Sequence, residues 1–90
     1  MTTVDIYSSA GCPYCVKAKQ LLDKKNVSYN ELRVDQIPRL AEEAVQRSGG
    51  RRTVPQIFIN ETHVGGCDEL YSLEKAGRLD GLLGMNQKPN

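Results

Sequence analysis

The hydrophobic positions of the chain change period several times, and each change marks a predicted element. Residues 3–7 alternate and are rich in β-branched and aromatic side chains, which predicts a strand. From Pro13 to about Asn26, apolar side chains recur at helical spacing, which predicts a helix with the proline in its first turn. A second strand is predicted over Val27–Val34, where the apolar phase slips at Asn30 and indicates an edge strand or a bulge.

A second helix is predicted over Ile37–Val45, because its apolar side chains form one continuous helical stripe. We expect Asp35 or Gln36 near its N-cap and Gly49-Gly50 at its end. Strand, helix and strand in this order imply two parallel strands joined by a right-handed crossover.

The remaining chain predicts a hairpin and a last helix. Val54–Ile59 is a strongly β-forming run, Asn60-Glu61 turns the chain, and Thr62–Val64 returns as a short strand. Asp68 is the expected N-cap of the last helix, whose leucines continue to Leu83. The predicted fold is therefore α/β, with a four-stranded mixed sheet built as βαβ then ββα and flanked by three or more helices.

Composition limits the class of protein. The 90 residues, 39% hydrophobic and 26% charged, suit one ordinary globular domain, which we expect over residues 1–85 with a frayed tail over 86–90. A net charge of +1 gives no electrostatic footprint for nucleic acid or a membrane surface. No apolar run approaches the roughly 18 residues that cross a bilayer, and the N-terminus lacks a signal-peptide pattern, so we expect a cytoplasmic protein with reduced thiols.

The pair Cys12 and Cys15 carries the candidate chemistry. It follows a predicted strand and begins a predicted helix, where unpaired N–H groups and the helix dipole favour a thiolate. In such settings the pKa of a cysteine falls from about 8.5 to somewhere near 3.5–7.5. We expect Cys12 to be the exposed nucleophile and Cys15, one turn inward, to attack the mixed disulfide formed at Cys12.

A zinc site is the competing interpretation of this spacing. His63 and Cys67 supply two further candidate ligands for a site with the CxxC pair. The long gap between Cys15 and His63 disfavours it, and CxxC beside a βαβ pattern is typical of a redox motif. We therefore predict no metal site and interpret His63 as a surface residue of its strand.

Three segments together resemble a dithiol glutaredoxin of the thioredoxin superfamily. They are Val4–Cys15 with its CPYC motif, Thr53–Ile59 with TVP, and Val64–Leu70 with two glycines, a cysteine and two acidic residues. The resemblance covers nearly the whole chain. It implies a thioredoxin-like fold and a monomeric enzyme that uses glutathione as co-substrate and has no tightly bound cofactor. The implied substrates are protein–glutathione mixed disulfides and protein disulfides such as that of ribonucleotide reductase.

The resemblance also implies a glutathione site, with a cis Val54–Pro55 bond that offers the Val54 backbone to the tripeptide. Cys67 and Asp68 open a helix whose N–H groups suit a carboxylate, and Asp68 or Glu69 suits the ammonium group. Cys67 is either a buried residue lining the groove or a redox-modifiable thiol. The implied set is Tyr14, Arg52, Thr53, Val54, Pro55, Gly66, Cys67, Asp68 and Glu69. Arg52 is assigned to the glycyl carboxylate in preference to Arg51.

One position departs from the family pattern. Many glutaredoxins carry a lysine three residues before the first cysteine, where this chain has Ser9. Its absence implies weaker glutathione affinity and gives weight to an alternative, a redoxin reduced directly by a thioredoxin-type reductase. A second alternative is a carrier in which Cys12 and glutathione hold a [2Fe–2S] cluster between two chains, which Pro13 disfavours in the family.

Overall fold

Four strands form one mixed sheet in the computed structural model, which describes residues 2–84. In the order β2-β1-β3-β4, the strands are β2 (Asn30–Arg33), β1 (Val4–Ser8), β3 (Gln56–Ile59) and β4 (Thr62–Gly65). β1 runs parallel to β2 and antiparallel to β3, and β3 and β4 form an antiparallel hairpin. The predicted βαβ then ββα order and the edge position of the second strand are confirmed. The predicted domain boundary at residue 85 and the tail over 86–90 lie outside the described residues.

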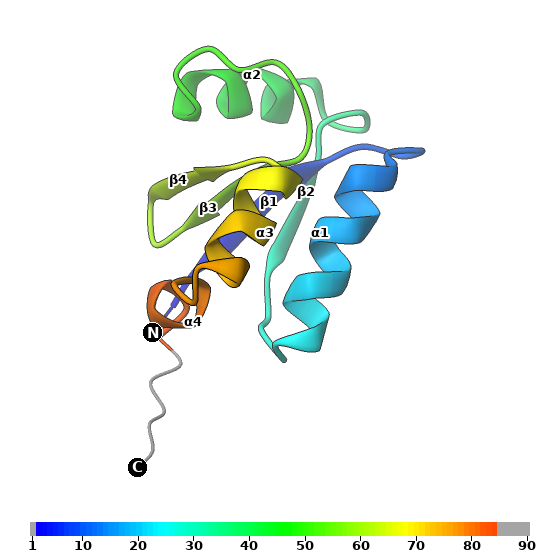
Figure 1. Ribbon diagram of the computed structural model, residues 1–90. Helices are drawn as coiled ribbons and strands as arrows, with labels where there is room; N and C mark the ends of the chain where they lie inside the picture. The colour runs from blue at the N-terminus through cyan, green and yellow to red at the C-terminus, as the bar shows by residue number, and fades with distance from the viewer. Residues whose placement is uncertain (1, 85–90) are drawn as a thin grey trace.

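Within residues 2–84, four helices flank the sheet: α1 (Pro13–Lys24), α2 (Pro38–Arg47), α3 (Cys67–Lys75) and α4 (Leu79–Leu82). In Figure 1, α1 and α3 lie on one side of the sheet and α2 lies across the other. Each strand presents alternate side chains to the two faces because successive residues of a strand point in opposite directions. In β1, Ile6 therefore belongs to the core under α1 and α3, whereas Tyr7 packs under α2.

The two faces of the sheet have different cores. The α1 and α3 face holds an aliphatic cluster that includes Ile6, Leu22, Ile57 and Leu70, all fully buried. Under α2 the cluster is smaller and contains aromatic rings: Tyr7, Leu40, Ala44 and Phe58. The Tyr7 hydroxyl hydrogen-bonds with Glu43 and accepts from Arg47 at 2.8 Å.

The predicted capping side chains do not cap α2 or α3. The N-cap of α2 is Ile37, with no capping side chain, because Asp35 instead binds Arg33 and accepts from the Ala10 N–H at 3.2 Å. The N-cap of α3 is Gly66, and Asp68 lies inside the first turn.

Three element boundaries also differ from the sequence prediction. β2 is shorter than expected, since Val27 packs on the aliphatic core before the strand begins. β3 begins at Gln56, directly after Pro55. The predicted last helix is two helices, separated by Gly77 with a φ of +73°.

Candidate active site

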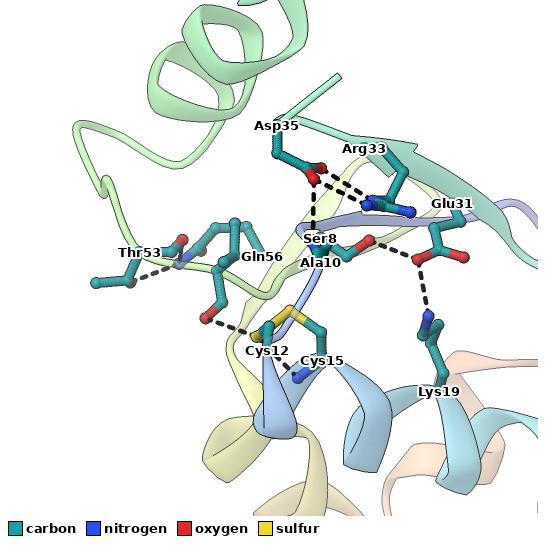
Figure 2. The surroundings of a disulfide bond; sticks show 11 residues. Ser8, Ala10, Cys12, Cys15, Lys19, Glu31, Arg33, Asp35, Thr53 and Gln56 are labelled. Carbon is teal, nitrogen blue, oxygen red and sulfur yellow. Dashed lines mark hydrogen bonds and ion pairs between the residues drawn. A yellow bond between two sulfur atoms is a disulfide. The ribbon is translucent and has the colours of Figure 1, made fainter. Parts of the chain in front are cut away.

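Cys12 and Cys15 lie at the amino end of α1 and are joined by a disulfide, with 5.2 Å between their Cα atoms (Figure 2). Cys12 is the N-cap of α1, with extended backbone angles, and Pro13 begins the helix as predicted. The Cys15 N–H points at the Cys12 sulfur, with 3.1 Å between nitrogen and Sγ. Such an N–H group stabilises negative charge on sulfur in the reduced form.

The two cysteines differ in exposure. Cys15 is buried, with 1% of its surface exposed, whereas Cys12 is half-buried. Cys15 lies on the buried side of α1, so Cys12 is the cysteine that a substrate can reach more easily. Cys15 is the more buried of the two cysteines, as predicted, whereas Cys12 is half-buried rather than exposed.

A groove of about 240 Å³ adjoins the disulfide and contains all but one of the predicted glutathione-binding residues. The Val54–Pro55 peptide bond is cis, as the family resemblance implied, and the Val54 carbonyl oxygen lies 3.8 Å from Cys12 Sγ. The groove is lined by Tyr14, Arg51, Thr53, Val54, Pro55, Gly66, Cys67, Asp68 and Glu69.

The amino end of α3 forms one wall of this groove. The first turn of a helix leaves its N–H groups without intrahelical acceptors, and in α3 these belong to Cys67 and Asp68. Glu69 folds back so that its Oε1 accepts the N–H of Gly66 at 2.6 Å. This wall combines N–H groups suited to a carboxylate with two acidic side chains suited to an amine.

Comparison with known proteins gives one consistent answer. The family model for glutaredoxin matches residues 4–64. The chain belongs to the glutaredoxin family. It is 58% identical to glutaredoxin 1 of Rickettsia prowazekii over 82 residues, covering 90% of this chain and 86% of the relative. It is 53% identical to glutaredoxin 3 of Escherichia coli K12 over 83 residues, covering 92% and 99%.

Solved structures agree with the family assignment. The solution structure of a Brucella melitensis glutaredoxin is 49% identical, with a TM-score of 0.81 and coverage of 99% of this chain and 96% of that one. A buckwheat glutaredoxin–glutathione complex is 30% identical, with a TM-score of 0.83 and coverage of 92% and 77%.

The fold is the thioredoxin-like α/β fold of the family. As a glutaredoxin, the chain is a glutathione-dependent thiol–disulfide oxidoreductase with a Cys12–Cys15 dithiol. The family uses glutathione as a substrate.

The arginine preferred from sequence does not line the groove. Arg52 lies in a neighbouring hollow of about 390 Å³, lined by α2 and the loop before β3, while Arg51 lines both that hollow and the groove. An Arg51 nitrogen is 4.0 Å from Oε1 of Glu69 on the opposite wall. Adjacent residues of an irregular loop point to different sides, so sequence position alone did not distinguish the two arginines.

Cys67 is a buried thiol in the groove wall. Burial raises the pKa of this thiol above its ordinary value, which favours the protonated form at neutral pH. Because the thiolate is the reactive form of cysteine, this environment favours the groove-lining interpretation over the redox-modifiable one.

The opposite flank of the disulfide carries charged side chains that sequence reasoning did not single out. A cavity of about 450 Å³ there is lined by Ser9, Cys12, Cys15, Lys19, Glu31 and Arg33, among others. Glu31 accepts from Lys19 at 2.8 Å and from the buried Ser8 hydroxyl at 2.6 Å, and both bonds lower its pKa. Charges in this flank pair with each other in Figure 2.

His63 is half-buried rather than a surface residue. Its Nε2 lies 2.7 Å from Oε1 of Gln56, and its ring stacks on Phe58 with 4.9 Å between centroids. Within residues 2–84, no group of three or more His, Cys, Asp or Glu side chains is placed to hold a metal ion. In the same range no helix has the length and apolar character needed to span a membrane.

Proposed function

We propose that this glutaredoxin reduces protein–glutathione mixed disulfides with Cys12 as the nucleophile. The supporting observation is the difference in exposure between the two cysteine residues at the start of α1, with the Cys15 N–H directed at Cys12 Sγ. An N–H group and a helix amino end stabilise the thiolate of the sulfur that a substrate reaches first. Cys12 is then the attacking cysteine, and Cys15 is the resolving cysteine.

In the proposed first step, the Cys12 thiolate attacks the glutathione sulfur of the mixed disulfide. A bond forms between Cys12 Sγ and that sulfur, the substrate disulfide breaks, and the protein thiolate leaves and takes a proton from solvent. The thiolate of a second glutathione then attacks the glutathione sulfur bound to Cys12. Oxidised glutathione leaves and the Cys12 thiolate is restored.

Protein disulfides require both cysteines in this proposal. Cys12 forms a mixed disulfide with the substrate, and Cys15 attacks Cys12 Sγ and releases the substrate as a dithiol. The product is the Cys12–Cys15 disulfide seen here, which two molecules of glutathione reduce while forming one molecule of oxidised glutathione. Ribonucleotide reductase is a proposed substrate of this second type.

The groove beside Cys12 is the proposed glutathione seat. The Val54 backbone pairs with the cysteinyl residue of glutathione, which places the ligand sulfur near Cys12. The N–H groups of Cys67 and Asp68 receive the γ-glutamyl carboxylate, and Asp68 or Glu69 receives its ammonium group. Tyr14, Thr53, Pro55 and Gly66 complete the contact surface.

The glycyl carboxylate has two candidate partners, Arg51 and Arg52. Arg51 has the stronger geometric support because it lines the groove itself, whereas Arg52 lies in the adjoining hollow. Replacing each by Ala in turn separates them: the partner's loss raises the KM for the glutathione mixed disulfide, and the other's loss does not.

The proposed protein acts as a monomer in the cytoplasm, where a reducing environment maintains the dithiol.

The decisive experiment compares Cys12→Ser and Cys15→Ser, which each remove one sulfur of the same pair. In an assay with the glutathione mixed disulfide of a protein thiol, Cys12→Ser abolishes turnover and Cys15→Ser retains it. With a protein disulfide as substrate, both variants lose activity. Full activity of Cys12→Ser on the mixed disulfide contradicts the proposed roles.

The electron donor is tested with the wild-type protein. Ser9, in place of the family's lysine, is the one observation that favours direct reduction by a thioredoxin-type reductase. We expect glutathione to reduce the Cys12–Cys15 disulfide and the reductase, supplied with NADPH alone, to leave it oxidised. Faster reduction by the flavoenzyme than by glutathione supports the alternative.

A further inference from the structure

Gln56 is a fully buried polar side chain directly behind the proposed glutathione seat. It begins β3, one residue after Pro55, and 0% of its surface is exposed. Its Nε2 donates to the carbonyl oxygen of Thr53 at 3.0 Å and lies 3.2 Å from the Thr53 hydroxyl (Figure 2). Within the part of the chain that the structure describes, these are the two hydrogen bonds of Thr53, a residue outside any helix or strand.

The Thr53 carbonyl determines how the Gln56 amide is oriented. A carbonyl only accepts hydrogen bonds, so the NH₂ group of Gln56 faces Thr53 and its oxygen faces the other way. That oxygen lies 2.7 Å from Nε2 of His63. An amide oxygen also only accepts, so Nε2 of His63 must carry a hydrogen.

His63 is in turn held by a stack of rings on the α2 face. Its imidazole lies on Phe58, and the guanidinium of Arg47 lies over the Phe58 ring at 4.1 Å from its centroid. Tyr7 meets Phe58 edge-on, with 5.8 Å between centroids. The imidazole therefore has a fixed plane, and its Nε2–H has a fixed direction.

We infer that His63 is a positioning residue for glutathione binding: through the Gln56 amide, it fixes the Thr53–Val54 backbone beside Cys12. Without the His63 donor, the buried Gln56 oxygen has no hydrogen-bond partner. Rotation or a shift of the amide then lowers the free energy of the folded protein. Any such movement changes the support of Thr53, next to the Val54 backbone that meets the ligand. The inference rests on the proposed glutathione seat and adds a residue from β4 that does not line it.

Steady-state kinetics of His63→Phe test the inference. Phenylalanine keeps an aromatic ring on Phe58 and removes the Nε2–H donor. With the mixed disulfide of glutathione and cysteine as substrate, we expect KM to rise about fivefold, the equivalent of one lost hydrogen bond, and kcat to stay within about twofold. Thr62→Ala, an exposed neighbour on β4, is the matched control with unchanged KM.

A double-mutant cycle with Gln56→Leu separates positioning from general destabilisation. If His63 acts through Gln56, His63→Phe has no further effect on KM once Gln56 is replaced. Additive effects of the two substitutions, or an unchanged KM in folded His63→Phe, overturn the inference. A wild-type protein without glutathione-dependent turnover refutes the proposed function, and the inference falls with it.

A third measurement needs no variant. His63 is the single histidine of the chain, so its ring signals in a long-range ¹H–¹⁵N spectrum are unambiguous. Burial lowers the pKa of His63, so the ring is neutral at pH 7 and one nitrogen carries the hydrogen. We expect the Nε2–H tautomer. An Nδ1–H tautomer contradicts the inference even if His63→Phe fails to fold.

Discussion

The two flanks of the Cys12–Cys15 disulfide differ in the groups they present to solvent. On the flank that holds the proposed glutathione site (the groove flank), the loop before β3 and the start of α3 present backbone groups to the space beside Cys12. On the other flank, charged side chains bind each other: Lys19 with Glu31, and Arg33 with Asp35. One flank exposes backbone groups to the proposed ligand, whereas the charged groups of the other flank pair with each other.

This difference explains where the strictest steric demands lie. A surface that binds through its backbone needs the chain to come close, so it depends on glycine and on buried supports such as Gln56. A surface of exposed ion pairs tolerates adjustment because long side chains move easily and each pair contributes little. We therefore expect equivalent substitutions to cost more on the groove flank.

Matched glycine substitutions give the largest expected contrast. Gly65 has a φ of +117°, and an added Cβ would lie 2.8 Å from Oε1 of Glu69. Gly11, on the other flank, has a φ of +67° and nothing within 4 Å of an added Cβ. We expect Gly65→Ala to cost about 2–3 kcal/mol in unfolding free energy and Gly11→Ala about 1 kcal/mol, because only the first adds a clash to backbone strain.

Urea unfolding of both variants measures this contrast, with equal m-values as evidence of a common two-state transition. The clash at Gly65 also displaces Glu69 from the Gly66 N–H, so KM for the glutathione mixed disulfide should rise in that variant. Equal stability losses in the two variants would show that the flanks do not differ in steric tolerance.

Replacement of Glu69 tests the backbone contact directly and has the next largest effect. Glu69→Ala removes the acceptor of the Gly66 N–H at the start of α3 and is expected to cost about 1 kcal/mol. Glu69→Gln keeps an oxygen acceptor at the same reach and should recover most of the stability. Thermal unfolding of the three proteins at one pH gives the ranking. A Gln variant as unstable as the Ala variant would indicate that charge, rather than this hydrogen bond, matters.

Part of this contrast can be predicted from sequence. The CPYC and TVP segments and the glycine pair before Cys67 point to the groove flank through their resemblance to the glutaredoxin pattern, which implies a glutathione site there. Periodicity likewise predicts the strand and helix order, since burial of an apolar face is repeated along each element. Both kinds of signal are local or regular.

Interactions between segments are what the sequence did not reveal. Asp35 has the ordinary chemistry of an N-cap, but Arg33 and the Ala10 N–H compete for its carboxylate. His63 fits the alternating pattern of its strand. That pattern predicts which face of the sheet a residue lies on, but not how far α2 and its neighbours cover that face. The choice between Arg51 and Arg52 depends on loop geometry, which has no period.

Ser9→Lys tests whether a charge at this position of the other flank influences the Cys12 sulfur. Ser9 and Cys12 line the same cavity. A cation about 6 Å from the sulfur in water-like surroundings stabilises the thiolate by about 0.7 kcal/mol. This stabilisation lowers the pKa of Cys12 by about half a unit. Alkylation rates of the reduced protein across pH measure this shift, with Ser9→Gln as the uncharged control. Identical profiles for the Lys and Gln variants would mean that position 9 does not affect the thiolate.

The smallest expected effect comes from Asp35, an exposed carboxylate of the charged flank. Its hydrogen bond with Arg33, assisted by the Ala10 N–H, lowers its pKa from the ordinary 3.8 to about 2. Between these two values the unfolded chain binds more protons than the folded one at this site. The contribution of Asp35 to stability is therefore present above about pH 4 and is lost as the pH falls toward 2.

Asp35→Asn should remove that part of the acid dependence. The difference in unfolding free energy between wild type and variant is expected to be constant above about pH 4 and to shrink toward pH 2. Glu31 keeps its own lowered pKa in both proteins. The difference in unfolding free energy between wild type and variant therefore isolates the contribution of Asp35. Glu42→Gln, which removes a carboxylate without an ion pair in the described chain, serves as the control. A difference that stays constant down to pH 2 would mean that the Arg33–Asp35 ion pair does not stabilise the fold.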